Sequence, residues 1–152
     1  TEVNLLVKGE LVCSKSYNIG TVRMLNDAVD FGEWKRLEAD MRTLSEIYSG
    51  TNIIGSGGNI NKLYRLAEKT DKKRQRISVI VLKSLYEKLK LLSFEERMQV
   101  FNLKPDRADV IVPASEIFLT IAEILHSEYI YVPVIGLADG IIDGLYAANR
   151  NR

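Results

Sequence analysis

The sequence predicts an α/β domain in which an antiparallel meander is followed by alternating helices and strands, with a helical insert between the second and the last helices. Three observations predict this class. The 152 residues are 46% apolar and 27% charged, with only 10 Gly and 3 Pro, as in globular chains. Apolar residues first alternate with polar ones, which is typical of strands. Farther along they recur every three or four positions, which is typical of helices.

The meander and the first long helix follow from these two periods. Residues 3–8 and 11–17 predict paired strands joined by a tight turn at Gly9, and residues 19–25 predict a third strand. Residues 32–49 predict a helix, because the large apolar residues of this stretch lie on one face. These residues are Trp34, Leu37, Met41, Leu44 and Tyr48.

The rest of the chain predicts further helices and two short strands. Residues 51–54 form a β-branched run that ends in a glycine-rich loop at residues 55–58. Residues 71–76 are charged and predict a polar loop. Ser78 and Ser93 are expected to be the N-caps of two helices. The other expected elements are a helix over residues 60–69, a long helix over 105–126, a strand over 129–132 and a terminal helix after Gly136.

Charge and cysteine content exclude several classes of protein. With 21 Lys and Arg against 20 Asp and Glu, the net charge is +1, which disfavours nucleic-acid binding and binding to a membrane surface. Cys13 is the only cysteine, so we expect no internal disulfide and no Cys-based zinc site. No apolar stretch of the sequence is long enough to span a membrane, and no signal peptide is expected. We therefore expect a cytoplasmic protein.

The order of elements resembles a ribonuclease-H-like lobe, the unit duplicated in actin, Hsp70 and sugar kinases. Four segments also resemble, in order, motifs of the exopolyphosphatase and guanosine pentaphosphate phosphohydrolase (Ppx/GppA) family. Thr1-Glu2 and the following Gly20-Thr21-Val22-Arg23 are similar to the end of its Gly-Gly-Gly-Ser-Thr-Glu motif and to its Leu-Gly-x-Val-Arg stretch. The glycine loop is similar to its second glycine loop. Residues 103–114 and 136–142 are similar to its Leu-x-Pro-Glu-Arg-Ala-Asp-Val-Ile-x-Pro-Gly and Gly-Leu-Arg-Glu-Gly-Ile-Leu motifs.

The resemblance implies that the chain is the second lobe of a two-lobe phosphatase. The first strand of the lobe and the whole first lobe, with the catalytic Glu, are then expected outside this sequence, and no catalytic residue is expected within it. The family removes a terminal phosphate from polyphosphate or guanosine pentaphosphate with the help of Mg²⁺. Glu2 matches the Glu of the triple-glycine motif, which implies a role in holding Mg²⁺. The alternative is an exposed terminal Glu, because one carboxylate makes a poor Mg²⁺ site.

The residues themselves also point to a phosphate-binding loop. Gly55, Ser56, Gly57, Gly58 and Asn59 lie between a predicted strand and a predicted helix. Unpaired amides and the helix dipole favour an anion at such a place, and glycines let a phosphate approach the backbone. The spacing fits neither a P-loop nor a dinucleotide fingerprint. The alternative is a structural turn that requires a positive φ.

Other charged residues have two interpretations each. Arg23 contacts substrate phosphates, as the resemblance implies, or forms a salt bridge. Arg107 and Asp109 are expected to be helix-start charges in a structural ion pair. The run Lys72-Lys73-Arg74-Gln75-Arg76 follows a polyanion or is a solvated loop, and the second interpretation is the commoner one for a charge run.

The sequence leaves three functions open. The chain is a phosphohydrolase lobe that is inactive alone, the nucleotide-binding lobe of an actin-like kinase or ATPase, or a non-catalytic interaction module. Residues 103–114 favour the first. In a ribonuclease-H-like sheet the first strand is central, so its absence is expected to expose two long, apolar strand edges. The gap then closes by collapse, or a second copy pairs there to form a homodimer.

Overall fold

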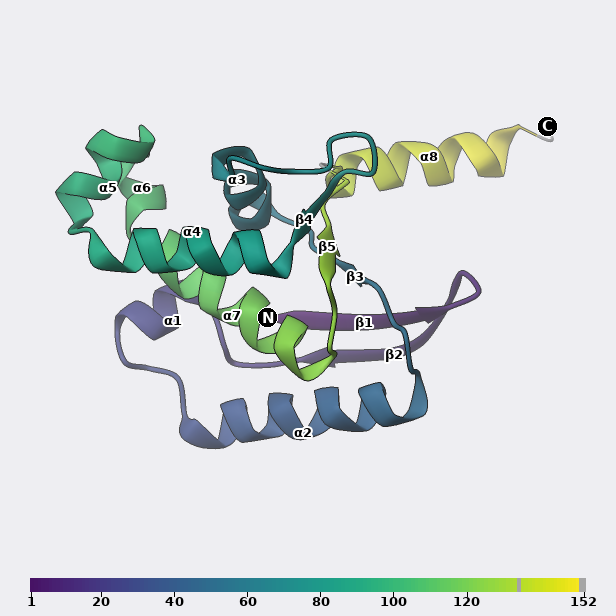
Figure 1. Cartoon of the computed structure of the whole chain (residues 1–152). Helices are drawn as coiled ribbons and strands as arrows, with labels where there is room; N and C mark the ends of the chain where they lie inside the picture. The colour runs from purple at the N-terminus through teal and green to yellow at the C-terminus, as the bar shows by residue number, and fades with distance from the viewer. Residues whose placement is uncertain (134, 151–152) are drawn as a thin grey trace.

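The computed structural model describes residues 1–133 and 135–150 (Figure 1). The hairpin of residues 2–16 lies over the helix of residues 31–47, and a separate small sheet lies among the remaining helices (Figure 1). The elements, in chain order, are β1 (Glu2–Val7), β2 (Glu10–Ser16), α1 (Thr21–Leu25), α2 (Phe31–Ile47), β3 (Ile53–Ile54), α3 (Gly58–Leu66), β4 (Arg76–Ser78), α4 (Val79–Leu91), α5 (Phe94–Phe101), α6 (Pro105–Ala108), α7 (Ile111–Ile124), β5 (Tyr129–Tyr131) and α8 (Leu137–Asn149).

The predicted hairpin and the helix after it are confirmed. Strands β1 and β2 pair antiparallel, and Gly9 turns the chain with a φ of +87°. The hairpin is tied to α2 through Asp40, whose carboxylate accepts hydrogen bonds from Lys15 Nζ at 2.6 Å and from the Tyr17 hydroxyl at 2.8 Å. Burial, together with the hydrogen bond to Asp40, raises the pKa of Tyr17 above its usual range. The phenol is therefore a permanent donor in this contact.

The prediction of a third strand over residues 19–25 is wrong. This segment forms the short helix α1, in which the Met24 amide donates to the Gly20 carbonyl at 2.9 Å. Met24 packs against the core, whereas Val22 and Leu25 are exposed. In this short helix only Met24 of the apolar residues faces the core. The apolar residues of the segment therefore do not share one buried face, as they would in the predicted strand.

The polar loop predicted over residues 71–76 is present as an exposed turn over residues 72–75, but Arg76 begins β4, a strand that the sequence did not predict. The main chains of Asp71 and Arg76 bond to each other in both directions, at 3.0 and 3.1 Å, and β4 then pairs antiparallel with β5. Gln75 supplies the left-handed residue of this turn, with a φ of 48°. The basic run is thus an ordered hairpin, and β5 is the middle strand of the sheet β3-β5-β4.

The helix predicted over residues 105–126 is divided into α6 and α7. Arg97 explains the division, because its Nη1 donates to the Ala108 carbonyl at 3.1 Å and its Nε donates to the Leu89 carbonyl at 2.9 Å. A side chain thus satisfies the carbonyl at the end of α6. The capping box predicted at Ser93 and the N-cap predicted at Ser78 are both present.

Helix α7 is the centre of the molecule and packs against α1, α2, α3, α4 and α6. It contributes to both apolar clusters, one under the hairpin and α2 and one between α3, α4 and the second sheet. The two sheets do not pair with each other, and β3 has only two residues. One of the two expected strand edges is therefore short. Helix α8 extends away from the rest with its described side chains exposed (Figure 1). Within the described residues, no helix has the length and apolarity that a membrane crossing requires.

Candidate functional site

The glycine loop begins where β3 ends, and its first glycine is a packing requirement. Gly55 donates its amide to the Tyr131 carbonyl at 2.8 Å and is buried. A Cβ at this position would lie 2.8 Å from Ile60 Cγ1, 3.2 Å from Ile130 Cγ2 and 3.2 Å from Phe118 Cε1. The core therefore leaves no room for a side chain at Gly55.

The third residue of the loop is a backbone requirement. Gly57 has a φ of 111° and a ψ of 170°, a conformation that is essentially restricted to glycine. It is the N-cap of α3 and makes no side-chain capping bond. The structural interpretation of the loop, a turn that needs positive φ, is therefore correct at this position.

The same loop presents unpaired amides to solvent. Ser56, Gly57 and Gly58 are exposed. Among the described residues, the main-chain amides of these three residues and of Asn59 donate to no protein acceptor. The first turn of α3 holds no acidic residue that would neutralise the positive end of the helix dipole. The loop thus has the electrostatic features of an anion site.

Arg107 lies directly against this loop, which the sequence did not predict. Its Nη1 donates to Asn59 Oδ1 at 2.9 Å, and a Cβ on Gly58 would lie 3.2 Å from Nη2 and 3.4 Å from Nη1. The absence of a side chain at Gly58 therefore makes room for the guanidinium. The expected structural ion pair is a long contact of 3.7 Å from Nε to Asp106 Oδ2.

The guanidinium of Arg107 keeps donors available beside the amides. Its side chain is 40% exposed, and one of its five N–H groups bonds to Asn59. A guanidinium next to a row of free amides matches the planar, bidentate recognition that arginine gives to phosphate oxygens. The signal for Arg107 was present in the sequence, because this residue lies within the motif-like segment at residues 103–114.

The structure places the two other predicted site residues elsewhere. Glu2 lies on β1 and Arg23 on α1, and both side chains are exposed. Burial lowers the pKa of the Thr1 amino group, and the charges of Glu2 and Arg23 act on the same group, Glu2 raising its pKa and Arg23 lowering it. In the described part of the chain, no side-chain hydrogen bond or ion pair joins either residue to the glycine loop.

A metal site cannot be built from the described residues alone. They contain no group of three or more His, Cys, Asp or Glu side chains that could hold an ion. Glu2 belongs to no such group, and Mg²⁺ needs near-octahedral oxygen coordination, part of which is usually supplied by water and substrate phosphates.

Comparison with known proteins gives the family of the chain. The model of the Ppx/GppA phosphatase family matches residues 1–148. The chain belongs to the Ppx/GppA phosphatase family. The resemblance expected from the four sequence segments is thereby confirmed. No curated protein matches the chain at a significant level.

Solved structures of Ppx/GppA proteins are similar to the chain. A family member from Aquifex aeolicus is 24% identical, with a TM-score of 0.67, over 93% of this chain and 51% of that chain. The type II variant of the Ppx/GppA phosphatase from the same organism is 25% identical, with a TM-score of 0.66, over 88% and 49%. An exopolyphosphatase from Cytophaga hutchinsonii is 18% identical, with a TM-score of 0.71, over 97% and 54%.

These likenesses confirm the predicted α/β fold class. The chain spans about half the length of these solved Ppx/GppA structures. In this chain, the exposed glycine loop and Arg107 together have the free amides and the positive charge that a phosphate requires.

Proposed function

We propose that the chain is the second lobe of a two-lobe phosphohydrolase that releases the terminal phosphate of inorganic polyphosphate or guanosine pentaphosphate. Membership of the Ppx/GppA phosphatase family supports this proposal, as does the similarity to an exopolyphosphatase. The span of about half of the similar structures supports the assignment to one lobe. The first strand of the lobe and the first lobe belong, in this proposal, to a longer protein.

The observation that carries the proposal is the position of Arg107 beside the free amides of the glycine loop. The lobe binds and orients a phosphate there through the amides of Ser56 to Asn59 and through the guanidinium. Fixing the phosphate in position and neutralising its charge are the main tasks in phosphoryl transfer. Asn59 has a positioning role, because its Oδ1 holds the guanidinium at 2.9 Å.

Activation of the attacking water is assigned to residues outside this chain. The catalytic Glu is assigned to the first lobe, and so are most of the oxygens that would hold Mg²⁺. When bound in the longer protein, Mg²⁺ would neutralise charge on the phosphates. Glu2 and Arg23 are proposed to face the first lobe, where Glu2 contributes one carboxylate and Arg23 one cation. This chain alone is therefore expected to release no phosphate.

Binding of phosphate to the loop is tested by titration of ¹⁵N-labelled chain with orthophosphate and tripolyphosphate. The amide signals of residues 56–59 are expected to shift, and Arg107→Gln is expected to weaken tripolyphosphate binding at the loop about tenfold, as the loss of a charge-assisted contact does. Arg42→Gln is the matched control, because Arg42 is an exposed arginine on α2. Unchanged loop signals in the wild-type chain, or equal losses in both variants, would refute the loop as a phosphate site.

The homodimer is a separate proposal. Strand β1 pairs only with β2 among the described strands, and its other edge is a template for a further strand. In the longer protein that edge is covered by the first strand of the lobe, and in this chain a second copy pairs there. Light scattering after gel filtration is expected to give twice the mass of the 17.2 kDa chain. A monodisperse monomer would contradict this.

A further inference from the structure

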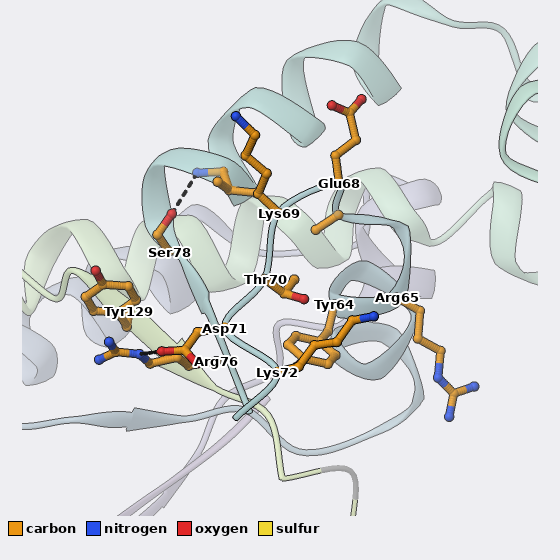
Figure 2. A pocket seen from close by; sticks show the side chains of 12 residues that line it. Tyr64, Arg65, Glu68, Lys69, Thr70, Asp71, Lys72, Arg76, Ser78 and Tyr129 are labelled. Atoms are coloured by element: carbon orange, nitrogen blue, oxygen red, sulfur yellow. Dashed lines mark hydrogen bonds and ion pairs between the residues drawn. The ribbon is translucent and has the colours of Figure 1, made fainter. Parts of the chain in front are cut away.

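A pocket lies at the C-terminal end of α3, whereas the glycine loop lies at its N-terminal end. It has a volume of about 710 Å³ and lies between the end of α3, the hairpin before β4 and the start of α4 (Figure 2). Pockets of this size hold small ligands. It shares no residue with the glycine loop, and its first lining residue, Tyr64, lies about 9 Å along the axis of α3 from Gly58. The side chains that line it are Tyr64, Arg65, Ala67, Glu68, Lys69, Thr70, Asp71, Lys72, Arg76, Ser78, Val81 and Tyr129.

The pocket has an excess of positive charge. Both of its carboxylates are neutralised, because Asp71 Oδ2 pairs with Arg76 Nε at 3.0 Å and Glu68 Oε1 pairs with Lys88 Nζ at 2.8 Å. Lys88 does not line the pocket. Three lining cations have no carboxylate within 4.0 Å among the described residues. They are Arg65, Lys69 and Lys72.

One wall of the pocket is rigid. The Arg76 guanidinium lies 3.8 Å from the centroid of the Tyr129 ring, and its side chain is only 14% exposed. Stacking and the ion pair with Asp71 fix this arginine (Figure 2). The mutual main-chain bonds of Asp71 and Arg76 also order the turn that carries Lys72. The backbone that carries Lys72 is thus ordered before a ligand binds, which reduces the conformational entropy lost on binding.

The two helix ends at the pocket act in opposite directions. The negative end of the α3 dipole disfavours an anion, whereas the start of α4 at Ser78 favours one. Because each end is equivalent to about half a charge, these effects largely cancel, and the unpaired side-chain cations decide the sign. Thr70, Ser78 and Tyr64 add hydroxyl groups that can donate to phosphate oxygens.

We propose that this pocket is a second anion site that binds a chain of linked phosphates. Arg65, Lys69 and Lys72 line the same pocket with their charged ends pointing in different directions (Figure 2), which matches an extended ligand with several negative charges better than a single phosphate. The chemistry is shared by free inorganic polyphosphate and by the phosphate arm of a nucleoside triphosphate. The pocket contains no residue of the glycine loop, so this proposal can be tested separately from the proposed function.

The test uses isothermal titration calorimetry of the full chain with tripolyphosphate, and NMR of ¹⁵N-labelled chain to locate binding. The double variant Lys69→Glu/Lys72→Glu is expected to weaken binding at the pocket by about tenfold or more. It is also expected to abolish the tripolyphosphate-induced shifts of the Thr70 and Asp71 amides while leaving those of residues 56–59 in place. Lys69→Arg/Lys72→Arg keeps the charge and is expected to retain binding.

The control variant is Lys35→Glu/Lys90→Glu, which makes the same change in net charge at two exposed lysines elsewhere. Its affinity for tripolyphosphate is expected to stay within about twofold of wild type. Equal losses in the control and the pocket variant would overturn the proposal, since they would reveal general electrostatics. Shifts confined to residues 56–59 in the wild-type chain would overturn it as well.

A second titration distinguishes the two sources of the phosphate chain. Equal affinities for tripolyphosphate and ATP support a site that reads the phosphates alone, and a tighter ATP complex that is lost in Lys69→Glu/Lys72→Glu supports a nucleotide. Tighter binding of a single-stranded oligonucleotide than of either would overturn the proposal in favour of a nucleic-acid surface. Thermal unfolding of each variant shows that the fold is kept.

Discussion

Replacing Gly55 with alanine tests whether this glycine is required for packing or for a ligand. The added methyl group would meet Ile60 at 2.8 Å and both Ile130 and Phe118 at 3.2 Å. Ile60 and Ile130 are fully buried and cannot move into solvent. Adding one carbon to such a packed site costs about 1–3 kcal/mol, and we take a central value of about 2 kcal/mol.

The size of the chain converts this cost into a melting temperature. Domains of about 150 residues lose about 2–4 °C per kcal/mol, so Gly55→Ala is expected to lower Tm by about 4–8 °C. Differential scanning calorimetry measures the change. Gly140→Ala is the control, because a Cβ on this exposed residue of α8 meets nothing within 4 Å, and its Tm is expected not to fall.

Gly58→Ala separates packing from binding three residues farther along. Here the new Cβ meets only the end of the Arg107 side chain, at 3.2 Å from Nη2, and a flexible guanidinium can move away. Tm is expected to stay within about 2 °C of wild type, whereas tripolyphosphate binding at the loop weakens. If Gly55→Ala melts like the wild-type chain, or if Gly58→Ala is the less stable of the two, the packing argument is wrong.

Three further changes test contacts that hold the lobe together. Arg97→Ala leaves two carbonyls without their charged donor and is expected to cost about 2 kcal/mol in urea unfolding. Ser93→Ala removes the cap of α5 and is expected to cost about 1 kcal/mol in the same assay. The Lys15 hydrogen bond, followed by that of Tyr17, lowers the pKa of Asp40, so the stability from this carboxylate is present above about pH 4 and is lost as the pH falls through the lowered pKa. Below about pH 4, the unfolding free energy is therefore expected to fall less steeply in Asp40→Asn than in wild type, and equal slopes would contradict the contact.

Local patterns in the sequence were enough to predict the elements whose stability is local. The hairpin turns at Gly9 with a positive φ, and the cap of α5 is a bond between Ser93 and a residue three positions on. Strand β4 was missed because it is only three residues long and directly follows a basic turn, and it exists through pairing with β5 across more than fifty positions of the chain. The break at Ala108 likewise depends on an arginine from another helix. Such tertiary partners leave no periodicity in the segment that they change.

The candidate site shows even more clearly that contacts between distant residues are not visible in local sequence patterns. Its glycines were visible in the sequence, but each glycine has a different physical reason. Packing excludes a side chain at Gly55, the backbone conformation requires Gly57, and only Gly58 makes room for a binding group. That group is Arg107, which lies 48 positions from Asn59 in the sequence and is held by it at 2.9 Å. Two of the three glycines would therefore be needed in a lobe that bound no phosphate at all. The Arg107 guanidinium beside the unpaired amides, rather than the glycines, therefore distinguishes a phosphate-binding loop from a structural turn.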